Sequence, residues 1–283
     1  MVKTEKWLAV LYLLSVIFGS ISFICMGIVW GYWAGALDHC SEALRDMFGN
    51  VIQTTGDSCG CILYGTSTYT GFVGSDTMVC RFVTFAHFPA VLIACAFALY
   101  HGYRVCVIPK NLPVQPARRS ILVIDRDGKR RNEVVYGVSR KPPMCYTAFA
   151  VNGGLFSILL FITAIVLTDG YFESCKQYKQ AVIKTIMATG NLARMIGDRL
   201  SCSATYDFLD YIQPDTSIAS NAQYYYGGTG VINTSILLNL VLVFTWAHFT
   251  IWVIIGIINI VAARDFKSTL RETTKLQPLN TDL

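Results

Sequence analysis

The sequence predicts an all-α membrane protein, a four-helix transmembrane bundle with disulfide-bonded extracellular loops, and three observations carry this prediction. The mean hydropathy is +0.46 and only 14% of the residues are charged, against about a quarter in an ordinary soluble domain. Four apolar segments are each long enough to cross a hydrocarbon core about 30 Å thick. Basic and acidic residues are divided between different connecting segments, as in proteins with a defined membrane topology.

The four apolar segments cover residues 7–33, 82–108, 146–167 and 230–263. We expect each to be a helix, because backbone polar groups inside a bilayer must find their hydrogen bonds within the segment. The first run is longer than the core of a signal peptide, about 7 to 15 residues, which favours an uncleaved span. Between and after the spans lie outer loops 34–81 and 168–229, an inner loop 109–145 and an inner tail 264–283. We therefore expect a single membrane domain without a separate soluble enzyme domain.

The distribution of charged residues predicts the orientation of the protein in the membrane. Residues 104–141 contain ten Lys and Arg against three acidic residues, whereas residues 35–80 contain one Arg against five acidic residues. Short loops rich in Lys and Arg stay in the cytoplasm, so the middle loop and both termini are expected inside. Because the positive charge is concentrated in this loop, we expect contact with membrane lipid and not with nucleic acid. We expect the protein in the plasma membrane or another membrane of the secretory pathway.

Six of the ten cysteines lie in the outer loops: Cys40, Cys59, Cys61, Cys80, Cys175 and Cys202. An even number on the side facing an oxidising lumen predicts three disulfides, whose pairing the sequence leaves open. Zinc is the rival, because Cys59 and Cys61 are close and His39 adjoins Cys40. Oxidation of outer thiols and the usual C-x₂₋₄-C spacing of structural sites favour disulfides, so we expect no metal site.

Short motifs surround these cysteines in a fixed order. They are Cys61-Ile62-Leu63-Tyr64-Gly65, Cys80-Arg81-Phe82, Glu173-Ser174-Cys175 and Leu200-Ser201-Cys202-Ser203. With four spans around them, they resemble the transmembrane protein 179 family, which consists of multi-pass membrane proteins without an established biochemical activity. The resemblance implies that Cys61, Cys80, Cys175 and Cys202 are the family cysteines, and that Cys40 and Cys59 form an added pair.

Small and polar residues within the spans predict how the helices pack. Gly27, Gly31 and Gly35 share one face of the first span, which allows a close approach of helices within the bundle or between copies. The fourth span carries a stripe directed at the bundle: Thr245, His248, Trp252, Gly256 and Asn259. Such residues either bond neighbouring helices or mark a functional site.

The histidines raise the possibility of haem. His101 and His248 lie at similar depths on the second and fourth spans, so one haem can be placed between them. His87, on the same face as His101, has no further intramembrane histidine in this reading. Pro89 is expected to kink the helix beside it. Neutral histidines bonded within the bundle are the simpler interpretation, and we expect no bound cofactor.

Three further segments predict contacts outside the spans. In residues 182–199 apolar side chains recur close to helical spacing among basic ones. This pattern predicts an outer amphipathic helix that covers the bundle or lies on a partner. In the inner loop, residues 121–124 and 134–136 with the turn Asp127-Gly128 are typical of a β-hairpin. Thr281 and Leu283 at the C-terminus have the form of a ligand for a PDZ-type scaffold.

No catalytic motif is found: the chain lacks a Gly-x-Ser-x-Gly elbow, a His-Glu-x-x-His pair and a phosphate-binding glycine loop. We therefore expect a non-enzymatic protein, an accessory or organising subunit that binds other membrane proteins. A pore-forming homo-oligomer is the alternative, because mild polar residues on the fourth span can line a pore between copies. A haem-binding redox membrane protein is the third interpretation.

Overall fold

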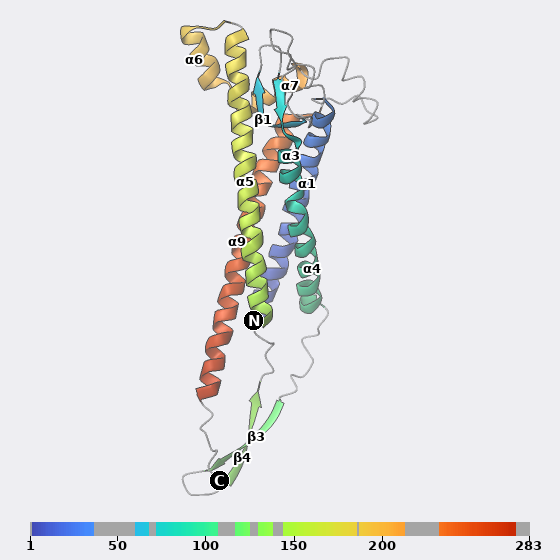
Figure 1. Ribbon diagram of the computed structural model, residues 1–283. Coiled ribbons are helices and arrows are strands. Elements are labelled where there is room, and N and C mark those ends of the chain that lie inside the picture. The colour runs from blue at the N-terminus through green and yellow to red at the C-terminus, as the bar shows by residue number, and fades with distance from the viewer. Residues whose placement is uncertain are drawn as a thin grey trace.

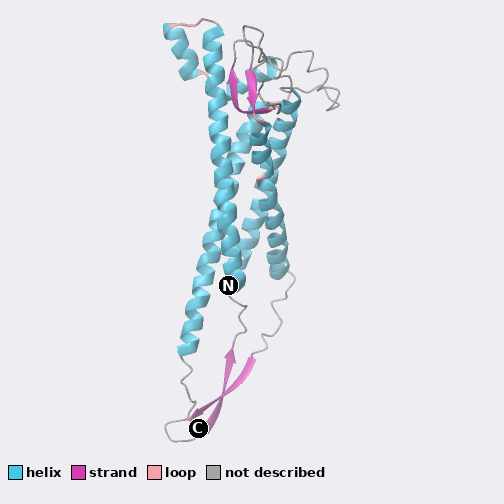
Figure 2. Ribbon diagram, viewed as in Figure 1, coloured by secondary structure: helices cyan, strands magenta, loops and turns pink. Residues whose placement is uncertain are grey.

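The computed structural model of the 283-residue chain describes residues 2–36, 60–67, 72–106, 117–124, 130–137, 144–185, 187–212 and 232–275. Long helices run side by side and form a bundle (Figure 1). One end of the bundle carries two short strands, within residues 61–75, and two short helices, within residues 190–212, and we call this end the cap. A β-hairpin lies beyond the other end, where the N-terminus is found (Figure 2).

Four stretches of helix are long and apolar enough to cross a membrane, and they lie where the sequence predicts the four spans. They are α1 (Val2–Ala36), α3 (Thr77–Phe85) with α4 (His87–Cys106), α5 (Met144–Thr185) and α9 (Thr234–Lys275). Helix α9 packs against both α1 and α5, and α1 also packs against α4. Helices α1 and α9 therefore form the middle of the bundle, each with two spanning neighbours.

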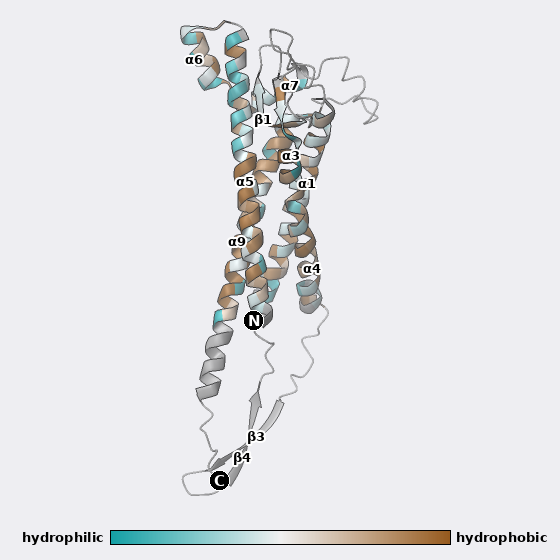
Figure 3. Cartoon of the chain, viewed as in Figure 1, coloured by the Kyte–Doolittle hydropathy of each residue, from teal (hydrophilic) through white to brown (hydrophobic). Residues whose placement is uncertain are grey.

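The bundle is apolar outside and partly polar inside, the reverse of a soluble protein. Residues such as Leu13, Ile17, Leu155, Val243 and Ile257 are exposed, and Figure 3 shows hydrophobic colour along the outer faces of the long helices. The buried polar residues of these helices are Ser15, Ser22, Thr84, His87, His101, Thr163, Thr245, His248 and Asn259. A lipid surrounding explains both observations, because lipid accepts apolar side chains and excludes polar ones.

Helices α1 and α9 bury one stripe each, at alternating spacings of four and three residues. In α1 the stripe is residues 8, 12, 15, 19, 22, 26, 29 and 33, and in α9 it is residues 234, 238, 241, 245, 248, 252, 255 and 259. This repeat of seven is the pattern of helices that pack at a shallow crossing angle. The two helices are antiparallel, since Ser15 meets His248 and Trp33 meets Thr234.

The second span is broken where the proline predicts a kink. Helix α3 ends at Phe85 and α4 begins at His87, with Ala86 between them. Pro89 has no N–H, and its ring clashes with the carbonyl of the residue four before it, Phe85. The predicted kink at Pro89 is therefore confirmed as a break one turn earlier. Upstream, the Asp76 side chain accepts a hydrogen bond from Met78 N at 2.8 Å and caps α3.

Helix α5 continues far past the predicted end of its span at residue 167. Its buried stripe extends through Leu167, Tyr171, Cys175 and Tyr178, and Gln177 Nε2 donates to Glu173 Oε1 at 2.8 Å. The first 18 residues of the predicted outer loop are therefore helix, because cap residues bury the same face that the bundle buries below. Helix α9 also runs beyond its span, into the predicted tail.

The helical bundle is accompanied by two small sheets, of which the sequence predicts only the hairpin in the inner loop. In the cap, β1 (Cys61–Ser67) pairs antiparallel with β2 (Phe72–Ser75), with an irregular register between Cys61 and Thr66. At the opposite end, β3 (Ala117–Ile124) pairs with β4 (Arg130–Gly137), from Ala117 opposite Gly137 to Ile124 opposite Arg130. The hairpin predicted in this loop is confirmed in its two strands, while its turn lies outside the described residues.

The predicted amphipathic helix 182–199 is instead two helices. After α5 ends at Thr185, Met187 adopts a φ of 51° and Gly190 a φ of 59°. Helix α6 (Gly190–Arg199) then folds back beside α5, and α7 (Cys202–Ile212) follows (Figure 1). Since none of the α6 residues is buried, this helix does not cover the bundle.

Candidate functional site

Two disulfides cross-link the elements of the cap. Cys61 on β1 is bonded to Cys80 on α3, and Cys175 on α5 is bonded to Cys202 on α7. These are the four cysteines that the family resemblance singled out. The remaining candidates, Cys40 and Cys59, lie outside the described residues.

The Cys61–Gly65 motif forms the strand β1, which lies on α5. Ser174 of α5 bonds this strand twice, donating to Ile62 O and accepting from Gly65 N, each at 2.8 Å. Tyr64 adopts a φ of 57° and donates its hydroxyl to Asp169 Oδ2 at 2.9 Å. A Cβ on Gly170 would lie 2.8 Å from the Tyr64 ring, so only glycine fits beneath it. Each of these contacts fixes the cap to the outer part of α5.

A buried histidine pair lies between α1, α4 and α9. The Nδ1 atoms of His87 and His248 are 3.2 Å apart, and both side chains are fully buried. Thr245 Oγ1 lies 3.3 Å from His87 Nε2, and Ser15 Oγ lies 3.0 Å from His248 Nε2. The expectation that His87 has no intramembrane histidine partner is therefore wrong. His87 is the first residue of α4, directly after Ala86.

The neighbouring hydrogen-bond donors determine which nitrogen of each histidine carries the proton. Trp252 Nε1, which can only donate, bonds His248 Nε2 at 3.0 Å. His248 must then carry its proton on Nδ1 and donate to His87 Nδ1. His87 in turn carries its proton on Nε2 and donates to Thr245 Oγ1. The chain continues from Thr245 to Ser22 at 3.1 Å and ends at the carbonyl of Val241, 3.4 Å from Ser22 Oγ.

This chain of donors is complete only when both histidines are neutral. A second proton on His248, on Nε2, would face the N–H of Trp252 Nε1. A second proton on His87, on Nδ1, would face the N–H of His248 Nδ1. The four spans contain no Asp, Glu, Lys or Arg within residues 7–33, 82–103, 146–168 and 234–263, so no carboxylate there balances an imidazolium. The geometry thus suits a neutral structural network and not acid–base chemistry.

Gly19 makes room for the pair. A Cβ at this position would lie 2.5 Å from Val91 Cγ2 and 2.6 Å from His248 Cε1. The glycine therefore lets α1 approach α4 and α9 closely enough for Ser15 and Ser22 to bond α9. The sequence interpretation missed Gly19, Ser15 and Ser22, although their spacing of four and three residues was a signal that could have identified them.

His101 occupies a separate aromatic pocket nearer the N-terminal end of α1. Its ring stacks on Tyr12 at a centroid distance of 5.6 Å and meets Phe149 edge-on at 6.0 Å. Both nitrogens of His248 already bond residues other than His101. A haem between His101 and His248 would require breaking the buried network, and this geometry argues against the haem interpretation.

Glycines pack α5 against α9. A Cβ on Gly153 would lie 2.9 Å from Gly256 Cα, so the two backbones are nearly in contact. Gly256, predicted to face the bundle, does so, as do the other stripe residues Thr245, His248, Trp252 and Asn259, all buried. Gly27 is different, because its Cβ would meet only Thr84 at an ordinary 3.9 Å. Gly31 is half-buried and lies beside the buried stripe of α1, not in it. The close approach predicted at Gly27 is therefore not found.

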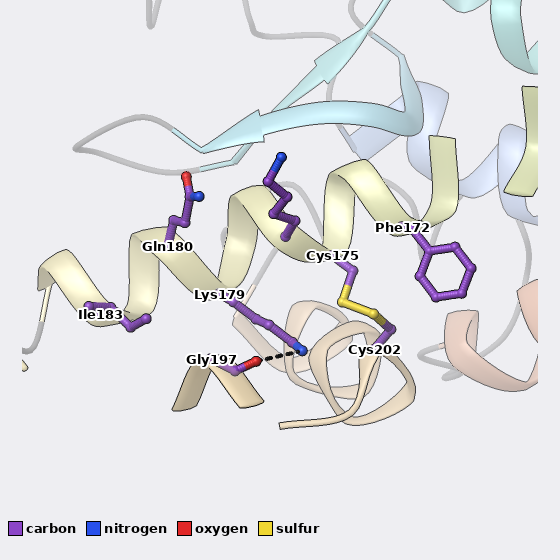
Figure 4. Close-up of a pocket in the computed structure, with 8 residues that line it drawn as sticks. Phe172, Cys175, Lys179, Gln180, Ile183, Gly197 and Cys202 are labelled. Atoms are coloured by element: carbon purple, nitrogen blue, oxygen red, sulfur yellow. Dashed lines mark hydrogen bonds between the residues drawn. A yellow bond between two sulfur atoms is a disulfide. The ribbon is translucent and has the colours of Figure 1, made fainter. Parts of the chain in front are cut away.

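A groove of about 320 Å³ opens on the cap between α5, α6 and α7 (Figure 4). Its lining includes Phe172, Ile183 and the disulfide of Cys175 with Cys202, together with Lys176 and Lys179. Lys179 Nζ donates to Gly197 O at 3.3 Å and ties α6 to α5. The groove therefore joins an apolar floor to cationic side chains.

In the described part of the chain, no group of three His, Cys, Asp or Glu side chains is placed to hold a metal ion. The C-terminal residues Thr281 and Leu283 lie outside the described residues. No protein-family model, no curated protein and no solved structure matches the chain. The resemblance to the transmembrane protein 179 family therefore stays a prediction.

Proposed function

We propose that this protein is a non-enzymatic membrane protein that binds another membrane protein through its cap. One observation carries the proposal: α6 buries none of its residues while exposing Leu192 and Met195, 56% and 50% accessible, after the still more exposed Met187. A ten-residue helix is marginal on its own. Burial of its apolar face against a partner would supply the stabilisation that the monomer does not.

Charge defines the chemistry of the partner. Residues 172–199 contain five basic side chains, Lys176, Lys179, Lys184, Arg194 and Arg199, against the two acidic residues Glu173 and Asp198. Both acids already have partners, since Glu173 pairs with Lys176 and Asp198 with Arg194. An ectodomain segment that combines apolar side chains with carboxylates is complementary to this surface. We therefore assign such a segment, in a neighbouring membrane protein, as the occupant.

The charge pattern supports a cap on the outer side of the membrane, with both termini in the cytoplasm of a plasma-membrane or secretory-pathway protein. In that orientation the basic hairpin of β3 and β4 faces the anionic inner leaflet. Thr281 and Leu283 are then available to a PDZ-type scaffold, so that the protein joins an outer partner to an inner one.

The test is the subunit content of the complex extracted from native membranes in mild detergent. We expect a foreign subunit that is lost from the double variant Leu192→Asp with Met195→Asp, and weakened by Arg199→Glu and by high salt. The matched control is Thr66→Asp, an exposed position of β1 on the cap, which should retain the subunit. Retention by all variants would contradict the proposal.

The same measurement addresses the pore alternative. The bundle interior is filled by large buried side chains, among them Tyr12, Leu160 and Trp252, so a pore would have to form between copies. A clean homo-oligomer that conducts ions in liposomes, with no foreign subunit, would replace the accessory function by the pore.

A further inference from the structure

Asp210 of α7 lies at the point where the cap meets two spanning helices. Its side chain is 6% exposed, and its Oδ2 accepts a hydrogen bond from the backbone N–H of Thr234 at 2.8 Å. Thr234 is the first residue of α9, and its hydroxyl accepts from Trp33 Nε1 of α1 at 2.9 Å. One carboxyl group thus links α7 to the adjoining ends of α9 and α1.

The second oxygen of this carboxyl is buried, and the described part of the chain offers it no partner. Asp210 Oδ1 makes no hydrogen bond to any described residue. Among the described residues, the titratable groups that face Asp210 are Tyr32 of α1 and Asp207 of α7 itself, while α9 contributes Thr234, which does not titrate. Neither titratable group is a cation. A carboxylate here keeps its charge in a buried place with half of its acceptor capacity unused, which is unfavourable.

Burial and the unpartnered oxygen both favour the protonated form of Asp210. Removal from water is the largest effect and raises the pKa of Asp210 to about 6, the bonds from Thr234 lower that pKa in part, and the charge of Asp207 raises it. An unfolded Asp has a pKa of about 3.9. Between these two values the folded protein binds more protons than the unfolded one.

We propose that Asp210 is a proton-binding group of the cap, which takes up a proton from an acidic medium and thereby tightens the joint of α7 with α9 and α1. Protonation removes the buried charge and leaves the bond from Thr234 N–H to the carbonyl oxygen in place. Because the pKa is higher in the folded state, the stabilisation is present at low pH and is lost as the pH rises toward and above 6. The joint is therefore tighter in an acidic lumen than at neutral pH.

The experiment is hydrogen exchange of the full-length protein in detergent at pH 5.0 and 7.5, corrected for intrinsic rates. We expect the amides at the start of α9 and in α7 to be better protected at pH 5.0 by about tenfold, because pH 5.0 lies about one unit below the pKa of Asp210 in the folded protein and above that of an unfolded Asp. Asp210→Asn, a neutral isostere, should remove this difference, and Asp207→Asn should keep it. Equal protection at both pH values, or an unchanged difference in Asp210→Asn, would overturn the proposal.

A second measurement covers the case in which Asp210→Asn fails to fold. Difference infrared spectra of the wild-type protein should show a buried carboxylic acid that ionises near pH 6. A titration confined to pH values near 4 would equally overturn the proposal. Both outcomes are independent of whether α6 binds a partner.

Discussion

The cap and the membrane-spanning bundle share the helices α5 and α9 but are held together by different interactions. In the cap, covalent bonds join Cys61 to Cys80 and Cys175 to Cys202, and ionisable side chains such as Asp169 and Asp210 accept hydrogen bonds. In the bundle, the contacts are neutral: a histidine pair between α4 and α9, and a pair of glycines between α5 and α9.

The difference follows from the surroundings of each region. Water drives apolar burial in the cap, but a cap this small gains little from it and relies on cross-links. In lipid, little hydrophobic force acts between helices, so close packing and hydrogen bonds decide how they associate. Three substitutions test this division, and we give them in order of decreasing expected effect.

Replacing the cap disulfide by Cys175→Ser with Cys202→Ser should have the largest effect. The bond joins residues 27 positions apart, and the loss of such a cross-link costs about 3 kcal/mol. Chemical unfolding followed by cap-specific hydrogen exchange should show α7 released while α1 and α9 stay protected. The control is Cys106→Ser, which removes an exposed free thiol. Loss of the spans together with α7 would show that the two regions are not held separately.

Gly153→Ala should come next, at about 2 kcal/mol, because the new methyl group meets the rigid backbone of Gly256. The same substitution on the facing helix, Gly256→Ala, should be nearly neutral, since the added Cβ would lie an ordinary 3.7 Å from its nearest atom, the carbonyl carbon of Gly153. Gly154→Ala, with no atom within 4 Å, is a second control. Thermal unfolding in detergent measures all three. Equal effects of the changes at 153 and 256 would contradict close glycine packing of α5 on α9.

His248→Phe should have the smallest effect of the three, about 1 to 2 kcal/mol. It leaves Trp252 Nε1–H and the His87 ring without their partner. A double-mutant cycle with His87→Phe should show a coupling of about 0.5 to 1 kcal/mol. Nitrogen NMR of the wild-type protein should find the proton of His248 on Nδ1 and that of His87 on Nε2. The opposite tautomers, or additive effects, would show that the two rings do not act as a pair.

Much of the bundle could be predicted because its signal is local. The apolar runs gave the four spans, and the stripe from Thr245 to Asn259 gave the buried face of α9. Helix α5 was cut short at residue 167, because hydropathy reports lipid contact and falls to polar values where the helix leaves the membrane. Tyr171, Cys175 and Tyr178 continue the buried stripe there, so periodicity was a better guide than hydropathy.

The candidate sites were predicted less well because they depend on distant partners. Depth along the spans places His248 opposite His101, whereas in the structure it is His87 that meets His248. Asp210 carries no local signal, since its partner Thr234 is 24 residues away. Gly153 likewise gives no local sign of its constraint, since only the crossing of α5 and α9 shows why a Cβ does not fit there.

The sequence by itself determined that four helices are suited to lipid, which face of α9 is buried, and which cysteines gather in the cap segments. These properties follow from the hydropathy, spacing and type of residues that are near one another in the chain. Only the tertiary structure decided which histidines meet, which cysteines pair, and that α6 stands beside α5 with its apolar residues exposed. Those outcomes depend on how separate helices approach in space, where a single missing Cβ, as at Gly19, decides how closely two helices and their side chains can come together.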